Sequence, residues 1–253
     1  MRTCTLMMVF GLLLPVSAAV AAEQSSIGGY RATVTPDNRL KYTLQAPDFT
    51  FTRITAPDTR QTEITITGSS DATVIIRFGG LSGLTVERGG QVVAIGSRDD
   101  SGEAAAALLN GRAVSAFRRL LGAYERELMN DTRRIADDTA PFVYSLLLSA
   151  AFVGELAGDP NAIDRTRDLI RRRIAAKLRE AVWQQRDCVT EYERALLAND
   201  DRNTQCMAAA DDMDSIFARA AERLLCASEF LAGALSAEAQ FVACSGLAPL
   251  KIQ

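Results

Sequence analysis

The sequence predicts an α+β fold in which an N-terminal antiparallel β module is followed by a disulfide-braced antiparallel α-helical bundle. Between residues 30 and 96, segments rich in threonine, valine, isoleucine and phenylalanine recur roughly every 8–12 residues between turn signals. From residue 101 the composition changes to alanine, leucine, arginine and glutamate and stays so to about residue 244. We expect a signal peptide (1–22), a β-rich module (23–98), the helical bundle (101–246) and a C-terminal tail (247–253).

The start of the chain predicts a removable signal peptide. Arg2 precedes an apolar run over residues 6–20, and Ala19 and Ala21 form the small-x-small pattern that a signal peptidase reads. The run is also short for a membrane span, which needs about 20 residues. A buried N-terminal helix is the alternative. We therefore expect cleavage after Ala21 or Ala22 and a protein that is periplasmic or secreted.

Seven strands are expected in the β-rich module. Ile64 and Ile66 alternate with polar residues, which is typical of strands that have one wet face. Gly89-Gly90 fits a two-residue hairpin turn. A small sandwich or a strongly bent sheet is expected, and a β-solenoid is the less favoured alternative because no fixed repeat period is visible. The expected strands are residues 32–35, 40–44, 49–55, 62–67, 74–78, 84–88 and 92–95.

The helical part begins with a short helix over residues 102–110 and a longer one over 112–129, whose apolar residues follow helical spacing. Residues 139–154 carry no charge, and Pro141 suits the first turn of a helix. This segment predicts a core helix that neighbours cover on all sides. A membrane-inserting element is the alternative.

A long helix is expected over residues 161–198, followed by a break at Asn199-Asp200-Asp201, where asparagine caps and aspartate favours the first turn. The last long helix is expected to end at Gly233, with Ser236 starting a short closing helix.

After cleavage of the signal peptide the chain holds four cysteines: Cys188, Cys206, Cys226 and Cys244. An even number in an oxidising compartment implies disulfides. Cysteines 18 residues apart in one helix lie about 27 Å apart, so each bond must join two helices. Local pairing (188–206 and 226–244) is slightly favoured because each pair spans a turn signal, and nested pairing (188–244 and 206–226) stays open. The spacing does not suggest a zinc site.

The absence of histidine excludes several chemistries. Without imidazole the chain can form no Ser-His-Asp triad, no Cys-His dyad and no histidine-bearing metal site. Glycine-rich nucleotide loops are also missing. An enzyme of this composition must use carboxylates. The cluster Asp211, Asp212 and Asp214 lacks the rest of a calcium loop and is interpreted as a helix start.

The most suggestive segment is basic. Residues 165–179 hold seven basic residues. A functional interpretation is that they form a helix face that docks anions. The alternative is an ordinary solvated helix face whose charge nearby acidic residues balance. The candidate residues for that face are Arg165, Arg171, Arg172, Arg173, Lys177 and Arg179.

These observations favour an exported, non-enzymatic envelope or secreted protein with a binding or scaffolding role. The alternatives are a carboxylate-dependent hydrolase of envelope glycans and a membrane-active secreted protein. No catalytic, cofactor-binding or metal residue is predicted, and no cofactor is expected. The partner is unknown; an envelope protein, an anionic lipid or a glycan is considered, and nucleic acid is not expected because no aromatic platform accompanies the charge. The strong preference for arginine over lysine suggests a GC-rich bacterial genome.

Overall fold

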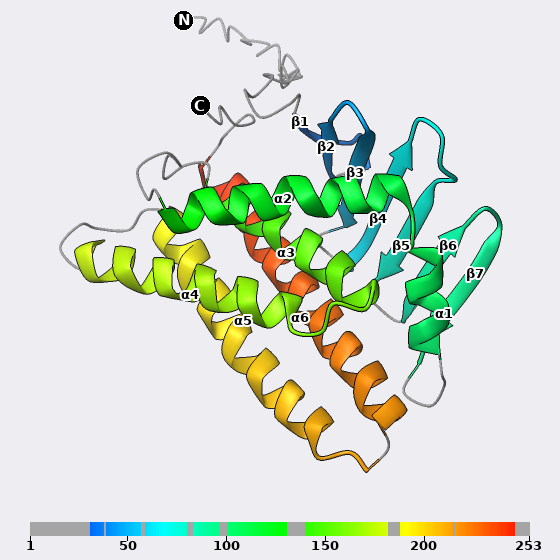
Figure 1. Ribbon diagram of the computed structural model, residues 1–253. Helices are drawn as coiled ribbons and strands as arrows, with labels where there is room; N and C mark the ends of the chain where they lie inside the picture. Colours follow the sequence, from blue (N-terminus) through cyan, green and yellow to red (C-terminus); the bar gives the residue numbers. More distant parts are fainter. Residues whose placement is uncertain are drawn as a thin grey trace, which may run out of the picture.

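The strands come first and the helices follow, as the sequence predicts (Figure 1). The computed structural model describes residues 31–37, 39–56, 59–79, 83–96, 101–130, 140–181, 188–214 and 216–245. The signal peptide and the C-terminal tail lie outside these residues, so both stay predictions. The α+β class is confirmed.

The strands form one antiparallel sheet. Each strand pairs with the next along the chain, so the described residues contain a seven-stranded meander rather than a sandwich. The sheet order equals the chain order, which needs only short hairpin connections. The strands are β1 (Arg31–Val34), β2 (Leu40–Gln45), β3 (Phe49–Ala56), β4 (Gln61–Gly68), β5 (Val74–Phe78), β6 (Leu84–Arg88) and β7 (Gln91–Ile95).

Six helices follow within the described residues. Short α1 contacts β6 and β7, and α2 crosses the sheet over β3 and β4. The last two helices run side by side as a hairpin that projects away from the sheet (Figure 1). The helices are α1 (Ser101–Leu108), α2 (Arg112–Asn130), α3 (Ala140–Leu156), α4 (Ala162–Ala181), α5 (Cys188–Asp211) and α6 (Ile216–Ser245).

One face of the sheet is covered by helices and the other is open. Burial alternates along β3 and β4, because successive side chains of a strand point to opposite faces. On the covered face, the ring of Phe51 stacks on Phe117 of α2 with ring centroids 4.6 Å apart. Phe78 contacts Phe152 of α3 at 4.8 Å. Sheet and helices therefore share one hydrophobic core.

Helix α3 lies at the centre of the helical part. Residues 143–154 are all buried, and α3 contacts α2, α4 and α6. Its side chains can be apolar all round because neighbours cover every side. The prediction of a core helix is confirmed. None of the described helices has the length and apolar character that a membrane span requires.

A buried ion pair joins the sheet to the helices. Arg53 of β3 and Glu238 of α6 are 1% and 0% exposed, and Nη2 of the arginine lies 2.7 Å from Oε2 of the glutamate. The Nη1 atom of Arg53 donates to Oγ of Ser149 at 3.1 Å and to the carbonyl oxygen of Ser145 at 3.3 Å. The guanidinium also lies 4.4 Å from the ring centroid of Tyr42. This cluster fixes β3 against α3 and α6.

The prediction of a single helix over residues 161–198 is wrong. Arg167 of α4 hydrogen-bonds to Asp200 and Asn203 of α5. In one straight helix, residues 33 apart would lie about 50 Å from one another. The chain therefore folds back between α4 and α5, and residues 182–187 of the predicted helix lie outside the described residues.

The predicted breaks at Asn199-Asp200-Asp201 and after Gly233 are also wrong. Both sites lie inside continuous helices, α5 and α6. Nδ2 of Asn199 donates to the carbonyl oxygen of Phe230, and Nδ2 of Asn203 donates to that of Cys226. These asparagines thus bind the facing helix instead of capping their own. Gly233 leaves room for Asn199, since a Cβ there would lie 2.3 Å from its Oδ1 atom.

The disulfides correct the favoured local pairing. Cys188 bonds to Cys244 and Cys206 to Cys226, with Cα atoms 5.9 and 5.8 Å apart. The pairing is nested because α5 ends at Asp211 and α6 begins at Ile216, so the two helices are joined midway between the inner two cysteines. The equal spacing of 18 residues on each helix is five turns, so both bonds lie on the same face of the hairpin.

Candidate functional site

The residues of the predicted anion-docking face on α4 differ in their exposure and in their contacts. Arg165 is exposed and pairs with Asp159. Arg171 is exposed and reaches Asp200 and Asp201 of α5 at 3.2 and 3.5 Å. The structure thus places these two arginines against carboxylates of the protein itself.

The other four residues of that face divide further. Arg172 is exposed, and its Nε atom donates to the carbonyl oxygen of Asp168. Arg173 is 7% exposed and turns to the interior. Lys177 and Arg179 belong to α4, and their side chains lie outside those described. Docking at this face stays a prediction that rests on Arg172 more than on its neighbours.

Two carboxyl groups have a raised pKa, and each has a contact inside the fold. Burial raises the pKa of Glu238, although Arg53 and hydrogen bonds from Ser145 oppose the shift. Burial also raises the pKa of Glu155, whose Oε1 accepts a hydrogen bond from the backbone nitrogen of Ile163 in the first turn of α4. The nearby acids Asp164 and Asp159 add to the raised pKa of Glu155, and Arg223 opposes them.

The acidic cluster near the hairpin turn is part of an ion-pair network. Asp211 pairs with Arg223 of α6 at 2.8 Å, and the same guanidinium reaches Asp164 of α4 at 3.2 Å. Within the described ranges, no three cysteine, histidine, aspartate or glutamate residues gather as metal ligands would.

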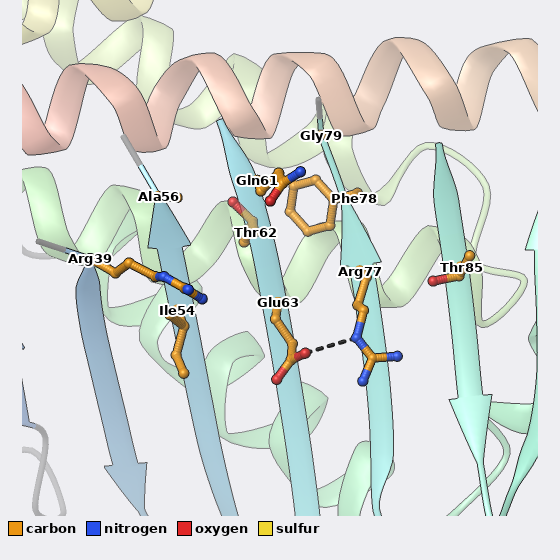
Figure 2. Close-up of a pocket in the computed structure, with 10 residues that line it drawn as sticks. All are labelled: Arg39, Ile54, Ala56, Gln61, Thr62, Glu63, Arg77, Phe78, Gly79 and Thr85. Atoms are coloured by element: carbon orange, nitrogen blue, oxygen red, sulfur yellow. Dashed lines mark hydrogen bonds and ion pairs between the residues drawn. The ribbon is translucent and has the colours of Figure 1, made fainter. Parts of the chain in front are cut away.

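A hollow of about 210 Å³ lies on the open face of the sheet (Figure 2). Figure 2 shows Glu63 and Arg77 pointing toward one another across β4 and β5. Nε of Arg77 donates to Glu63 at 2.8 Å and Nη1 donates to Glu87 at 2.9 Å. These two hydrogen bonds raise the pKa of Arg77. Its positive charge is therefore matched within the sheet, and Arg39, the other arginine of the lining, pairs with Asp37.

A larger groove runs along α2. One hollow of about 500 Å³ lies between α2, α3 and α4, and a second of about 680 Å³ lies at the start of α2 beside the β4–β5 turn. Ser115 and Arg119 line both hollows, so the two form one continuous surface, here called the α2 groove. In Figure 1, α2 lies along the outside of the molecule with α3 and α4 beside it.

The floor of the α2 groove is made of small and apolar residues. Gly122, Ala150, Ala151, Gly154 and Ala162 contribute to it from three helices. Small side chains there leave a trough, because the helix backbones come close to the surface. A Cβ on Gly154 would lie 3.3 Å from that of Ala162 and would tighten the α3–α4 contact.

Arginines form the rim of the groove. Arg118 and Arg165 share the carboxylate of Asp159, at 3.2 and 3.0 Å, so both already have a partner within the fold. Arg112, Arg119 and Arg126 are exposed, and none of them forms an ion pair with a described residue. These three, here called the α2 arginines, are the positive charges of the groove that remain available to a partner.

Sequence reasoning missed the α2 arginines and found one residue of this site, Arg165. A signal was present: the three arginines recur at intervals of seven residues, nearly two helical turns, and so share a face of α2. The trough beside them has no comparable signal, since it forms where three helices meet.

Comparison of the chain with protein-family models, curated proteins and solved structures finds no match.

Proposed function

We propose that this chain is an exported, non-enzymatic binding or scaffolding protein whose contact surface is the α2 groove. The observation that carries the proposal is the line of three exposed arginines that form no ion pair with described residues, beside a trough of small residues. A fold that balances the charges of Arg53, Arg77 and Arg167 with its own carboxylates leaves those of the α2 arginines for another molecule.

Export is supported by two independent features. The pattern of Arg2, the apolar run over residues 6–20 and the small residues Ala19 and Ala21 is that of a cleavable signal peptide. The two disulfides, Cys188–Cys244 and Cys206–Cys226, are typical of proteins that fold in an oxidising compartment. We place the protein in the periplasm of a bacterium or outside the cell.

The groove suits binding in energetic terms. Hydrogen bonds between an arginine and a carboxylate or phosphate are among the stronger contacts, at about 1.5–3 kcal/mol each when partly shielded from water. An exposed pair contributes less, about 0.2–1 kcal/mol. A partner that covers the trough between Gly122, Ala150 and Gly154 would exclude water from its edge and move the contacts toward the stronger case.

Photo-crosslinking in the producing cell tests the proposal. A photoreactive amino acid replaces Ser115, which is exposed and lines both halves of the groove. The matched control carries it at Arg194, which is exposed on α5 and does not line the groove. We expect a defined adduct from position 115 that position 194 does not give. Equal adduct patterns at the two positions, or none at position 115, would contradict the assignment of the groove.

A further inference from the structure

The α2 arginines form an evenly spaced line of charge. Arg112, Arg119 and Arg126 are seven residues apart on one helix, so at 1.5 Å per residue neighbours lie about 10 Å apart along its axis. The line spans about 21 Å in total. A single small anion can contact one of these guanidinium groups, or bridge two only with difficulty. Simultaneous contact with all three requires a long partner.

Carboxylates of the groove lie among the arginines. Asp159 pairs with Arg118 and Arg165, and Oδ2 of Asp71 accepts a hydrogen bond from the backbone nitrogen of Ala113. Asp48 and Glu125 also line the groove. A partner with continuous negative charge, such as an anionic bilayer, would bring like charges against these acids, which costs free energy. A partner with separated negative charges avoids them.

The shape of the groove also favours a long, narrow partner. Its two hollows, about 500 and 680 Å³, join end to end along α2, and small residues keep the trough shallow. A polypeptide segment can lie along such a trough over about 20 Å, in six or seven residues if extended. Its backbone would contact the floor at Gly122, Ala150 and Gly154 while its side chains reach the rim.

We infer that the α2 groove binds a linear acidic segment of another polypeptide, whose carboxylates recur at about 10 Å to meet Arg112, Arg119 and Arg126. Two conformations satisfy this spacing. A polyproline II segment with an acid at every third residue places them about 9 Å apart on one side, and a helix with an acid at every seventh residue places them about 10 Å apart. This inference rests on the proposed binding function and names the chemical class of the partner.

Fluorescence anisotropy with synthetic peptides tests the inference on the full mature protein. One probe is a proline-rich peptide with glutamate at every third residue, and another is a helical peptide with glutamate at every seventh. Each has a control of the same composition in which the glutamates are adjacent. We expect at least one spaced peptide to bind about tenfold or more tightly than its control, and more weakly as salt rises.

Two matched variants assign the binding to the groove. The variant Arg112→Gln/Arg119→Gln/Arg126→Gln should lose the difference between spaced and clustered peptides. The variant Arg60→Gln/Arg194→Gln/Arg202→Gln removes the same charge from exposed positions in the β3–β4 connection and on α5 and should keep it. Equal binding of spaced and clustered peptides, or equal loss in the two variants, would overturn the inference.

Vesicles separate failure of this inference from failure of the proposed function. Phosphatidylcholine vesicles with and without phosphatidylglycerol are used in sedimentation with the same variants. If the groove variant alone loses binding to anionic vesicles while no spaced peptide binds, the groove is a docking surface and the acidic polypeptide is the wrong partner. If neither probe binds and position 115 gives no adduct, both the inference and the proposed function fail.

Discussion

Arginine serves different purposes at the sheet–helix interface and in the α2 groove. Arg53 is buried, and its guanidinium contacts a carboxylate, a hydroxyl, a carbonyl oxygen and an aromatic ring. The α2 arginines are exposed and form no ion pair with a described residue. The same side chain therefore fixes the fold in one region and is left available in the other.

This difference shows that the residues in contact with an arginine, rather than its positive charge, indicate its role. The basic run over residues 165–179 is the most conspicuous positive segment of the sequence, yet Arg165, Arg167 and Arg171 are paired with Asp159, Asp164, Asp200 and Asp201. The α2 arginines are fewer and more widely spaced, but none of them forms an ion pair with a described residue. Four predictions, in descending order of expected effect, test this contrast.

The largest effect is expected at the buried ion pair. Glu238→Ala leaves the guanidinium of Arg53 in the interior without its countercharge, which should lower the free energy of unfolding by about 3–5 kcal/mol. Urea denaturation of the purified mature protein measures this. The double variant Arg53→Met/Glu238→Leu removes both charges and should recover most of the loss. A loss below about 1 kcal/mol in the single variant would show that the pair does not hold the sheet to α6.

A smaller effect is expected where α5 and α6 come closest. Gly233→Ala places a methyl group against the amide of Asn199 and should cost about 1–3 kcal/mol through overpacking. Asn199→Ala should also destabilise, because its hydrogen bond to the Phe230 carbonyl oxygen is lost. Since the double variant has no clash, its cost should be smaller than the two single costs combined. Simple additivity in this double-mutant cycle would contradict the close approach.

Glu155 is half-buried near the C-terminal end of α3 and provides a pH test. Burial raises its pKa above the ordinary value of 4.5, so the folded state holds the proton more tightly than the unfolded state. The stabilisation from this group is present at low pH and is lost as pH rises through the raised pKa. In Glu155→Gln this dependence is absent. The stability of the wild type relative to the variant should therefore fall as the pH rises from below 4.5 through the raised pKa.

Urea denaturation at several pH values gives that difference. If the wild type instead gains stability over Glu155→Gln as pH rises, the prediction is wrong. The fold would then favour the ionised form of Glu155.

The smallest effect on stability is expected in the groove. Replacement of Arg112, Arg119 and Arg126 by glutamine removes charges that form no ion pair with described residues, so the free energy of unfolding should change by about 0.5 kcal/mol or less. Urea denaturation next to the Arg60/Arg194/Arg202 control variant measures this. A loss of 2 kcal/mol or more would mean that the fold itself uses these arginines.

The part of the fold that depends on local pattern could be predicted. Alternation in segments such as Ile64 to Ile66 identified the strands, and the uncharged run over residues 139–154 identified the core helix. Asn199 and Gly233 led to wrong predictions of helix ends, because asparagine and glycine often lie at the ends of helices. Here they lie inside two helices and allow them to approach each other. That contact depends on residues far apart in the chain, which no local pattern contains.

The candidate site was harder to predict for the same reason. Arg53 and Glu238 are 185 residues apart, and nothing in either neighbourhood marks them as partners. The groove forms where α2, α3 and α4 meet, so its floor of Ala150, Gly154 and Ala162 reads as ordinary helix in the sequence. The seven-residue spacing of the α2 arginines is visible in the sequence, but only the structure shows that no described carboxylate pairs with them.

The yield of the adduct formed from position 115 in the groove variant tests the central claim most directly. The photoreactive residue at Ser115 is combined with Arg112→Gln/Arg119→Gln/Arg126→Gln and, separately, with Arg60→Gln/Arg194→Gln/Arg202→Gln. The account predicts that the adduct is lost in the first variant and kept in the second, while both unfold at the same urea concentration. Retention of the adduct in the folded groove variant would contradict the claim that the α2 arginines bind the partner.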